Sequence, residues 1–292
     1  MSLTTAQLRK AISVRARIDK IESRIVRLKK QLESILGRKT MQALPAKNQQ
    51  AKAGSKPLAA KKPKTGMYPE AKTWNPFKGC LFGCSYCAPS FQRQAKRQKQ
   101  NCMKCYRYIP HYHPDKLSKI PSSEIVFACG NGDISFCRPE FVRKIIEAIK
   151  QHKGKMRQTF YLQSKRPDCL KPYLHLLPGN VMLVTTLETN RDRGYDQISK
   201  APVPSKRYRQ FLSLKYPRKI VTIEPLVDFD VKPFAKWIIK IKPEYVWLGF
   251  NSKNKEVSLP EPSKEKVQRF IEILHRHNIE IRGKTLRGIK LP

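Results

Sequence analysis

Two observations predict an α/β fold with a parallel sheet for residues 67–292. Short apolar runs alternate with amphipathic stretches along this part of the chain, as in folds where a helix follows each strand. The runs are almost continuously apolar, which is typical of parallel strands that are covered on both faces. The sequence therefore indicates a single α/β domain that fills most of the chain.

The expected strands and helices follow one another in a regular order. Six apolar runs are expected to be strands: IVFACG (125–130), TFYLQS (159–164), VMLVTTLE (181–188), KIVTIEPL (219–226), YVWLGF (245–250) and IEIRG (279–283). Four amphipathic stretches are expected to be helices: 139–152, 205–216, 231–241 and 263–277. Ligand sites in such folds lie at the carboxyl ends of the strands, so the polar residues that follow each run are functional candidates. No Walker or Rossmann glycine motif occurs, so nucleotide binding by those motifs is not expected.

The N-terminal region is predicted to contain a helix and a linker. In residues 1–37, apolar side chains recur at alternating spacings of three and four, the pattern of a coiled coil: Ala11, Val14, Ile18, Ile21, Ile25, Leu28, Leu32 and Ile35. This helix, expected over 5–37, could instead pack on the main domain, but we favour self-association into a homo-oligomer. Lys, Ala, Pro and Gln dominate residues 38–66, which we expect to be a disordered basic linker.

The charge predicts an anionic partner. Lys and Arg number 60 against 22 Asp and Glu, which gives a net charge of +38. A field of this sign attracts polyanions, so nucleic acid is the expected partner and an anionic membrane surface is the alternative. Residues 91–113 interleave basic and aromatic side chains, as in surfaces that grip single strands, although a solvated helix followed by packed tyrosines would give the same pattern.

The compartment follows from what the sequence lacks. No apolar run approaches the roughly 20 residues that span a bilayer, and no signal peptide opens the chain. We therefore expect a cytoplasmic protein without a membrane span. In that compartment the eight cysteines are expected to be reduced and available for metal binding or chemistry.

Three cysteines lie within the segment GCLFGCSYC (79–87), at a spacing of C-x3-C-x2-C. A structural zinc site usually uses four protein ligands in two C-x2-C pairs, which would leave Cys80 unused. An iron–sulfur cluster held by Cys80, Cys84 and Cys87 would instead leave one iron without a protein ligand. Gly79 and Gly83 would allow the backbone to approach the sulfides, and Phe82 and Tyr86 could exclude water.

These residues resemble the radical SAM superfamily, whose signature is C-x3-C-x-aromatic-C, with Tyr86 at the aromatic position. TWNPFKGCLFGCSYC (73–87) is similar to the opening of a phage-associated, largely uncharacterised branch with a Trp-Asn-Pro and a Gly-Cys. Four later segments also look similar: 108–117, 162–170, 186–192 and 222–229. The resemblance covers about residues 70–290; Ala88 and Pro89 depart from the Tyr-Ala that follows the third cysteine in many relatives.

The resemblance implies a fold and two cofactors. The fold would be a partial (β/α)6 TIM-like barrel, with the cysteine loop after the first strand. A 4Fe-4S cluster would bind S-adenosylmethionine (AdoMet) through its open iron and donate an electron, which produces a 5′-deoxyadenosyl radical. A donor such as flavodoxin or ferredoxin would supply that electron.

The resemblance also suggests residues that bind AdoMet. Residues 129–133 stand where the superfamily has a Gly-Gly-Glu-like turn, although CGNGD departs from that pattern. The candidates are Gly130, Gly132, Asp133, Ser164, Lys165, Glu188 and Asn190. Ser164 and Lys165 would neutralise the AdoMet carboxylate, and Glu188 and Asn190 would meet its ribose or carboxylate. Cys129 is a further candidate, as a hydrogen-atom donor.

A second set of metal ligands follows the triplet. Cys102 and Cys105 form a C-x2-C pair, with His111 and His113 nearby, and two cysteines with two histidines can bind zinc. The H-x-H spacing is not that of a usual zinc finger, so an auxiliary cluster, a zinc shared with another chain, or no metal at all are alternatives.

The sequence therefore favours a radical SAM enzyme that acts on nucleic acid, by lesion repair or by modification of DNA or RNA. The alternative is a non-catalytic DNA- or RNA-binding protein in which a metal has only a structural role.

Overall fold

The computed structural model describes residues 19, 21–28, 30–31, 71–154 and 157–292, and the chain divides into two units, residues 1–62 and 63–292. Within the first unit the described residues are helical, and the side chains of Ile21, Ile25 and Leu28 are exposed. The rest of the predicted helix and the linker 38–66 lie outside the described residues, so the coiled coil stays a prediction. None of the helices in the described ranges is long and apolar enough to cross a membrane.

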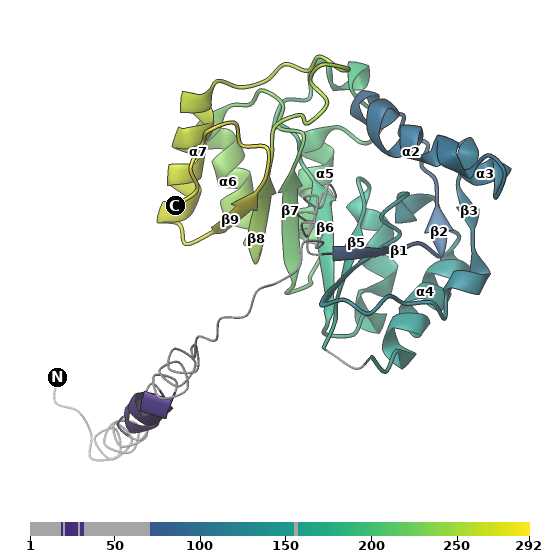
Figure 1. The fold of residues 1–292 in the computed structure, drawn as a ribbon. Helices are drawn as coiled ribbons and strands as arrows, with labels where there is room; N and C mark the ends of the chain where they lie inside the picture. The colour runs from purple at the N-terminus through teal and green to yellow at the C-terminus, as the bar shows by residue number, and fades with distance from the viewer. Residues whose placement is uncertain (1–18, 20, 29, 32–70, 155–156) are drawn as a thin grey trace, which may run out of the picture. The chain divides into compact units, whose positions relative to one another are not determined.

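The second unit is built on a parallel sheet whose strand order follows the chain. Its seven strands are β1 (Ala71–Trp74), β4 (Ile125–Ala128), β5 (Thr159–Gln163), β6 (Val181–Thr186), β7 (Lys219–Ile223), β8 (Tyr245–Leu248) and β9 (Glu280–Gly283). Each of these seven strands pairs in parallel with the ones before and after it in this order, and β1 and β9 form the two open edges. The sheet curls into a half-barrel (Figure 1), which confirms the predicted partial TIM-like barrel.

Four longer helices follow strands of this sheet. They are α4 (Pro139–Gln151), α5 (Pro204–Ser213), α6 (Val231–Ile241) and α7 (Lys264–Arg276). Proline occupies the first turn of α4 and α5, where its missing N–H costs no hydrogen bond. The Ser263 hydroxyl caps α7 by accepting from the Lys266 amide at 3.2 Å, so α7 begins where the sequence places a capping residue.

The two faces of the sheet are covered in different ways. Buried side chains of all four helices belong to one hydrophobic cluster with the convex face of the strands, including Ile145, Phe211, Phe234 and Phe270. A second cluster comes from the alternate positions of the strands and contains no residue of the described helices: Phe127, Tyr161, Met182, Val184, Ile220, Tyr245 and Trp247.

Helices of the described residues therefore cover the convex face, and cover of the concave face stays a prediction. On the concave face these large side chains pack together, and the hydroxyls of Tyr161 and Tyr245 lie 2.8 Å apart.

An insertion between β1 and β4 holds both cysteine sets. It contains an antiparallel ribbon of β2 (Phe77–Lys78) and β3 (His111–Tyr112), and the short helix α3 (Met103–Tyr106). Shorter helical turns lie at Ser85–Cys87, Ala88–Gln92, Arg93–Ala95, Lys96–Gln98 and Pro114–Lys116. Beyond the insertion, short turns follow the strands at Ile134–Phe136 and Tyr195–Gln197, and a ten-residue 3-10 helix, Pro167–Leu176, follows β5. The insertion thus starts at the carboxyl end of β1.

Candidate functional site

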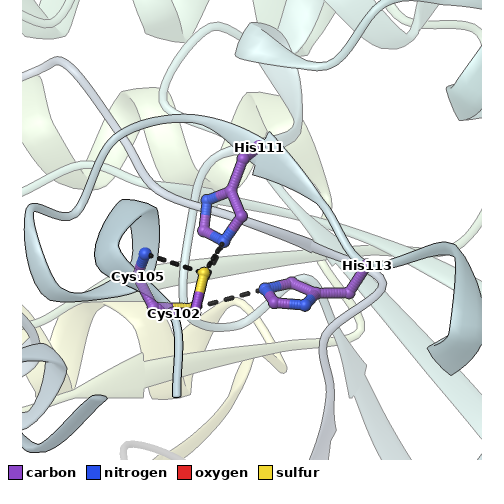
Figure 2. Close-up of side chains that lie close together, drawn as sticks. All are labelled: Cys102, Cys105, His111 and His113. Atoms are coloured by element: carbon purple, nitrogen blue, oxygen red, sulfur yellow. Dashed lines mark hydrogen bonds between the residues drawn. The ribbon is translucent and has the colours of Figure 1, made fainter. Parts of the chain in front are cut away.

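The insertion gathers its cysteines into two separate groups. Cys80, Cys84 and Cys87 lie on the loop after β2, whereas Cys102 and Cys105 lie at α3 and face two histidines of the β3 segment (Figure 2). All eight cysteines fall in the described residues, and each is a free thiol.

The loop that carries the triplet is held by the turn after β4. The Gly79 amide donates to the Asn131 carbonyl at 3.0 Å, and the Asp133 amide donates to the Gly79 carbonyl at 3.2 Å. Gly79 has a φ of +95°, and a Cβ there would lie 2.3 Å from the Ile109 carbonyl oxygen. The glycine is needed because two segments of this chain approach each other here, and its approach to a sulfide stays a prediction.

The triplet sits in an apolar enclosure. Phe82, Cys84 and Ala201 are buried together, and Cys80, Tyr86, Cys87 and Phe136 pack against them. The rings of Phe82 and Phe136 lie 4.7 Å apart, centroid to centroid. Side chains from the cysteine loop, the turn after β4 and the segment after β6 therefore shield the thiols from water.

Polar side chains reach Cys84 inside this enclosure. The Ser199 hydroxyl lies 3.0 Å from Cys84 Sγ, and Lys165 Nζ donates to the same sulfur at 3.3 Å. A hydrogen bond from the Cys87 thiol and the charge of Lys165 lower the pKa of Cys84 to about 5, although burial raises it. Burial raises the pKa of Cys80 to about 12. The site thus stabilises a thiolate at Cys84, the form in which cysteine binds a metal.

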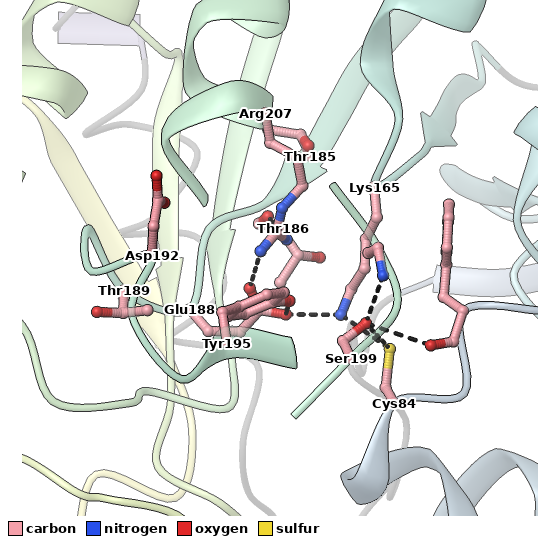
Figure 3. Close-up of polar contacts among 12 residues, drawn as sticks. Cys84, Lys165, Thr185, Thr186, Glu188, Thr189, Asp192, Tyr195, Ser199 and Arg207 are labelled. Carbon is pink, nitrogen blue, oxygen red and sulfur yellow. Dashed lines mark hydrogen bonds and ion pairs between the residues drawn. The ribbon is translucent and has the colours of Figure 1, made fainter. Parts of the chain in front are cut away.

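Lys165 joins this thiol to a buried carboxylate. Its Nζ lies 2.6 Å from Glu188 Oε1 (Figure 3). The same Nζ contacts the Tyr86 hydroxyl, which donates to Glu188 Oε1 at 2.5 Å. Arg207 Nη2 donates to Glu188 Oε2 at 2.7 Å, and the Tyr195 hydroxyl donates to Oε1 at 3.1 Å. Burial raises the pKa of Glu188, but Arg207 and Lys165 together hold it at about 2. Glu188 is therefore an anion whose partners come from this chain.

Asp133 connects the turns after β4 and β5. Its carboxylate accepts from the Ser164 hydroxyl at 2.7 Å, the Lys165 amide at 2.8 Å and the Ser135 amide at 3.0 Å. These bonds fix the position from which Lys165 extends toward Cys84. Gly132 lies directly beneath the cysteine loop, since a Cβ on it would be 2.7 Å from the Gly79 carbonyl oxygen. Gly130 packs against the Phe127 ring in the same turn.

Two candidates from the sequence lie elsewhere. The Asn190 side-chain oxygen accepts from the Asp230 amide at 2.8 Å, so it holds the loop after β7 and has no bond to the Glu188 network. Cys129 is buried in the convex cluster with Trp74 and Phe77, and burial raises its pKa. Its thiol thus lies among the side chains beneath the helices, which argues against the hydrogen-donor role.

Three members of the network were not predicted from the sequence: Tyr195, Ser199 and Arg207. Arg207 lies in the amphipathic stretch 205–216, which the sequence predicts to be a helix. Its side chain is 0% exposed. Nothing in the local pattern separates it from the exposed arginines around it, because its burial depends on how α5 packs behind β6.

The concave face next to this network carries further polar groups. Gln163 Nε2 donates to the Thr186 hydroxyl at 2.9 Å, but the buried Gln163 Oε1 has no partner among the described residues. Trp247 Nε1 donates to Glu224 Oε2 at 2.7 Å, and burial raises the pKa of Glu224. Buried polar atoms without a partner are rare in folded proteins, so Gln163 Oε1 fits a ligand that donates a hydrogen bond.

A pocket of about 200 Å³ opens beside the cysteine loop. Its lining is Lys78, Gly79, Phe91, Gln94, Ala95, Arg97, Gln98, Cys105, Tyr108 and Asn131. The pocket thus combines the rings of Phe91 and Tyr108 with Arg97, all from the basic and aromatic segment 91–113, and with Lys78 from β2.

Comparison with known proteins supports the fold. No family model and no curated protein matches the sequence. Among solved structures, a point mutant of spore photoproduct lyase is 11% identical with a TM-score of 0.50, over 72% of this chain and 75% of that one. A radical SAM methyltransferase from Sphaerobacter thermophilus is 15% identical with a TM-score of 0.48, over 74% of this chain and 67% of that one. At these identities the similarity concerns the fold of the half-barrel alone.

Proposed function

We propose that this chain is a radical SAM enzyme. The observation that carries the proposal is the placement of the three thiols. They lie on the loop after β2, in the insertion that starts at the carboxyl end of β1, and Lys165 and Ser199 hydrogen-bond the sulfur of Cys84. The half-barrel fold shared with spore photoproduct lyase agrees with this assignment.

The residues fit a 4Fe-4S cluster and AdoMet. Cys80, Cys84 and Cys87 would hold the cluster in an apolar enclosure and leave one iron for AdoMet. When bound, the two cofactors supply one-electron chemistry and a carbon radical. The chain itself excludes water through Phe82 and Phe136 and keeps a positive charge at Cys84 through Lys165.

In this proposal, two of the AdoMet candidates, Asp133 and Glu188, position other side chains of the site and do not contact AdoMet. Asp133 and Glu188 already accept hydrogen bonds from this chain on both carboxylate oxygens, so they position Lys165 and Tyr86. Gln163 Oε1, which has no partner in the described part of the chain, is then the group of the concave face that would accept from AdoMet. The phage-associated branch within the superfamily stays a prediction.

Nucleic acid is the proposed substrate class. The net charge of +38 favours a polyanion, and the cations Lys78 and Arg97 line the pocket beside the cysteine loop. Phe91 and Tyr108 line that pocket, and aromatic rings of this kind stack on unpaired bases. A base inside a duplex would have to leave the stack to reach this site.

Anaerobic reconstitution tests the activity. Wild-type protein with iron, sulfide and reductant should hold about four irons per chain, as a 4Fe-4S cluster requires, and should cleave AdoMet to 5′-deoxyadenosine. Cys84→Ala should lose both properties, whereas Cys137→Ala, a half-buried cysteine outside the triplet, should keep them. A wild-type protein that binds iron and nucleic acid but never cleaves AdoMet would support the non-catalytic alternative and overturn the enzyme.

A further inference from the structure

A second group of four ligands lies in the insertion, apart from the cysteine triplet. Cys102 caps α3 and Cys105 lies within it, while His111 lies on β3 and His113 directly follows that strand. Each residue offers one ligand atom, and the four atoms all lie within 4.8 Å of one another. Figure 2 shows the side chains pointing toward a common centre from the two elements.

The separations between these atoms match a single small ion. Cys105 Sγ lies 3.2 Å from His111 Nε2 and 3.3 Å from His113 Nε2, and Cys102 Sγ lies 3.5 Å from His111 Nε2. Tetrahedral zinc, with Zn–S near 2.3 Å and Zn–N of about 2.0–2.1 Å, places sulfur and nitrogen ligands about 3.5 Å apart. A polynuclear cluster needs a wider ring of ligands than this group provides.

The local structure explains the unusual H-x-H spacing. Residues two apart on an extended segment project to the same side, so His111 and His113 both face α3. Cys105 reaches the same centre because the first turn of α3 folds it back over Cys102, and the Cys105 amide donates to Cys102 Sγ at 3.4 Å. The histidine pair therefore comes from a strand, whereas the usual zinc finger takes its histidines from a helix.

His111 is also oriented by its surroundings. Its Nδ1 lies 2.7 Å from the Ile109 carbonyl oxygen, which can only accept, so Nδ1 carries the proton and Nε2 presents its lone pair to the centre. A carbonyl at the outer nitrogen is the usual support of a metal-bound histidine. Cys105 and His111 are buried, which protects the site from exchange with solvent.

We propose that Cys102, Cys105, His111 and His113 bind one structural Zn²⁺ ion. Four protein ligands complete a tetrahedron and leave no open position, so the ion stabilises the fold and takes no part in the reaction. The site shares no ligand with the cysteine triplet. Its occupancy can therefore be measured whether or not the proposed activity is correct.

The ion would hold residues 106–110, which include the pocket residue Tyr108, against the cysteine loop. The ligands enclose residues 106–110, and within this segment the Tyr108 carbonyl accepts from the Cys80 amide at 3.3 Å. Ile109 packs against Gly79, and β3 pairs with β2 just before the triplet. Zinc at α3 and β3 would thus hold Tyr108 beside the pocket and beside Cys80.

Metal analysis tests the site directly. A full-length Cys80→Ala/Cys84→Ala/Cys87→Ala variant removes the other thiol ligands and should still retain one zinc per chain. Adding Cys105→Ser or His113→Ala should abolish zinc retention, whereas adding Cys169→Ser or His152→Ala should leave it unchanged. Absence of zinc from the triple variant after incubation with Zn²⁺, or its retention after both ligand substitutions, would overturn the proposal.

The visible spectrum of bound Co²⁺ tests the same site without a ligand variant, and so does not depend on such a variant folding. Co²⁺ bound to the triple variant should give the intense visible bands of a tetrahedral site with thiolate ligands, and Zn²⁺ should displace it. A weak octahedral spectrum would refute the assignment.

Trypsin tests the role of the ion. Lys104 and Arg107 are exposed and lie between the ligands. Cleavage after them should be slow in the zinc-bound protein and at least tenfold faster after chelation. Equal rates would contradict the structural role.

Discussion

Lys165 Nζ lies 2.6 Å from Glu188 Oε1 and 3.3 Å from Cys84 Sγ, so one ammonium group connects a buried carboxylate with a thiol of the triplet. Lys165 follows β5, Glu188 follows β6, and Cys84 lies in the insertion after β1. The pairing of Lys165 with Glu188 therefore joins the carboxyl ends of two strands to the cysteine loop.

Arg207→Met should destabilise the fold strongly. Arg207 and Glu188 are both 0% exposed, and removing one partner of a buried ion pair costs about 3–5 kcal/mol. The free energy of unfolding, measured by urea denaturation of the metal-free protein, should fall by this amount. Arg218→Met is the matched control, because its pair with Glu244 is partly exposed and is worth at most about 1 kcal/mol. Equal losses in the two variants would contradict the buried network.

The stability should also depend on pH through Glu188. Its pKa is about 2 in the folded protein against an ordinary 4.5, so the folded state binds the proton more weakly than the unfolded state. The stabilisation is complete above about pH 4.5 and is lost as the pH falls toward 2, in total about 3 kcal/mol. Burial raises the pKa of Asp133, so the ionisation of this carboxyl lowers the stability of the folded state as the pH rises, opposite to the effect of Glu188.

The measurement is therefore the difference between wild type and Glu188→Gln. Unfolding free energies of both proteins, followed from pH 6 to pH 3, should converge as the pH falls. Parallel curves would show that Glu188 is not held as an anion in the folded protein.

Gly79→Ala should disturb the cysteine loop. A Cβ at this position would overlap backbone atoms of Ile109 and Pro110, and φ of +95° is unfavourable for alanine. We expect a loss of more than about 2 kcal/mol in stability and weaker iron binding. Gly179→Ala is the control, because a Cβ there meets nothing within 4 Å. Iron content and urea midpoints that match the wild type would show that the loop can move away from Ile109.

Charge reversal should locate the nucleic-acid surface. Arg97 lines the pocket and Lys99 is exposed near it, so Arg97→Glu/Lys99→Glu should weaken binding of single-stranded DNA or RNA. The slope of log K against log salt should become shallower by roughly 0.7 for each phosphate that the variant no longer neutralises. Lys236→Glu/Lys240→Glu makes the same charge change on the outer surface of α6 and should leave the slope nearly unchanged. An identical weakening in both variants would indicate binding through net charge alone.

The sequence predicted the strands whose side chains are buried on both faces of the sheet. Runs such as VMLVTTLE and YVWLGF have no polar alternation, and β6 and β8 lie within them. β1 was not among the predicted runs, since AKTW is short and contains a lysine that is exposed at the edge of the sheet. Its assignment as a strand depends on pairing with β4, a contact across some 50 residues of chain that no local pattern encodes.

The sequence by itself determined the chemistry that is available: three thiols at C-x3-C-x2-C, a second pair of cysteines with two histidines, and polar residues after each apolar run. Strand register and curvature decided which of these side chains meet. As a result, Lys165 contacts Glu188 and Cys84, and Asn190 bonds to the loop after β7. Arg207 is buried behind β6, where it pairs with Glu188. The physical reason is that local patterns specify which residues are apolar and how the backbone extends, whereas the burial of a charge beside its partner depends on contacts between segments far apart in the chain.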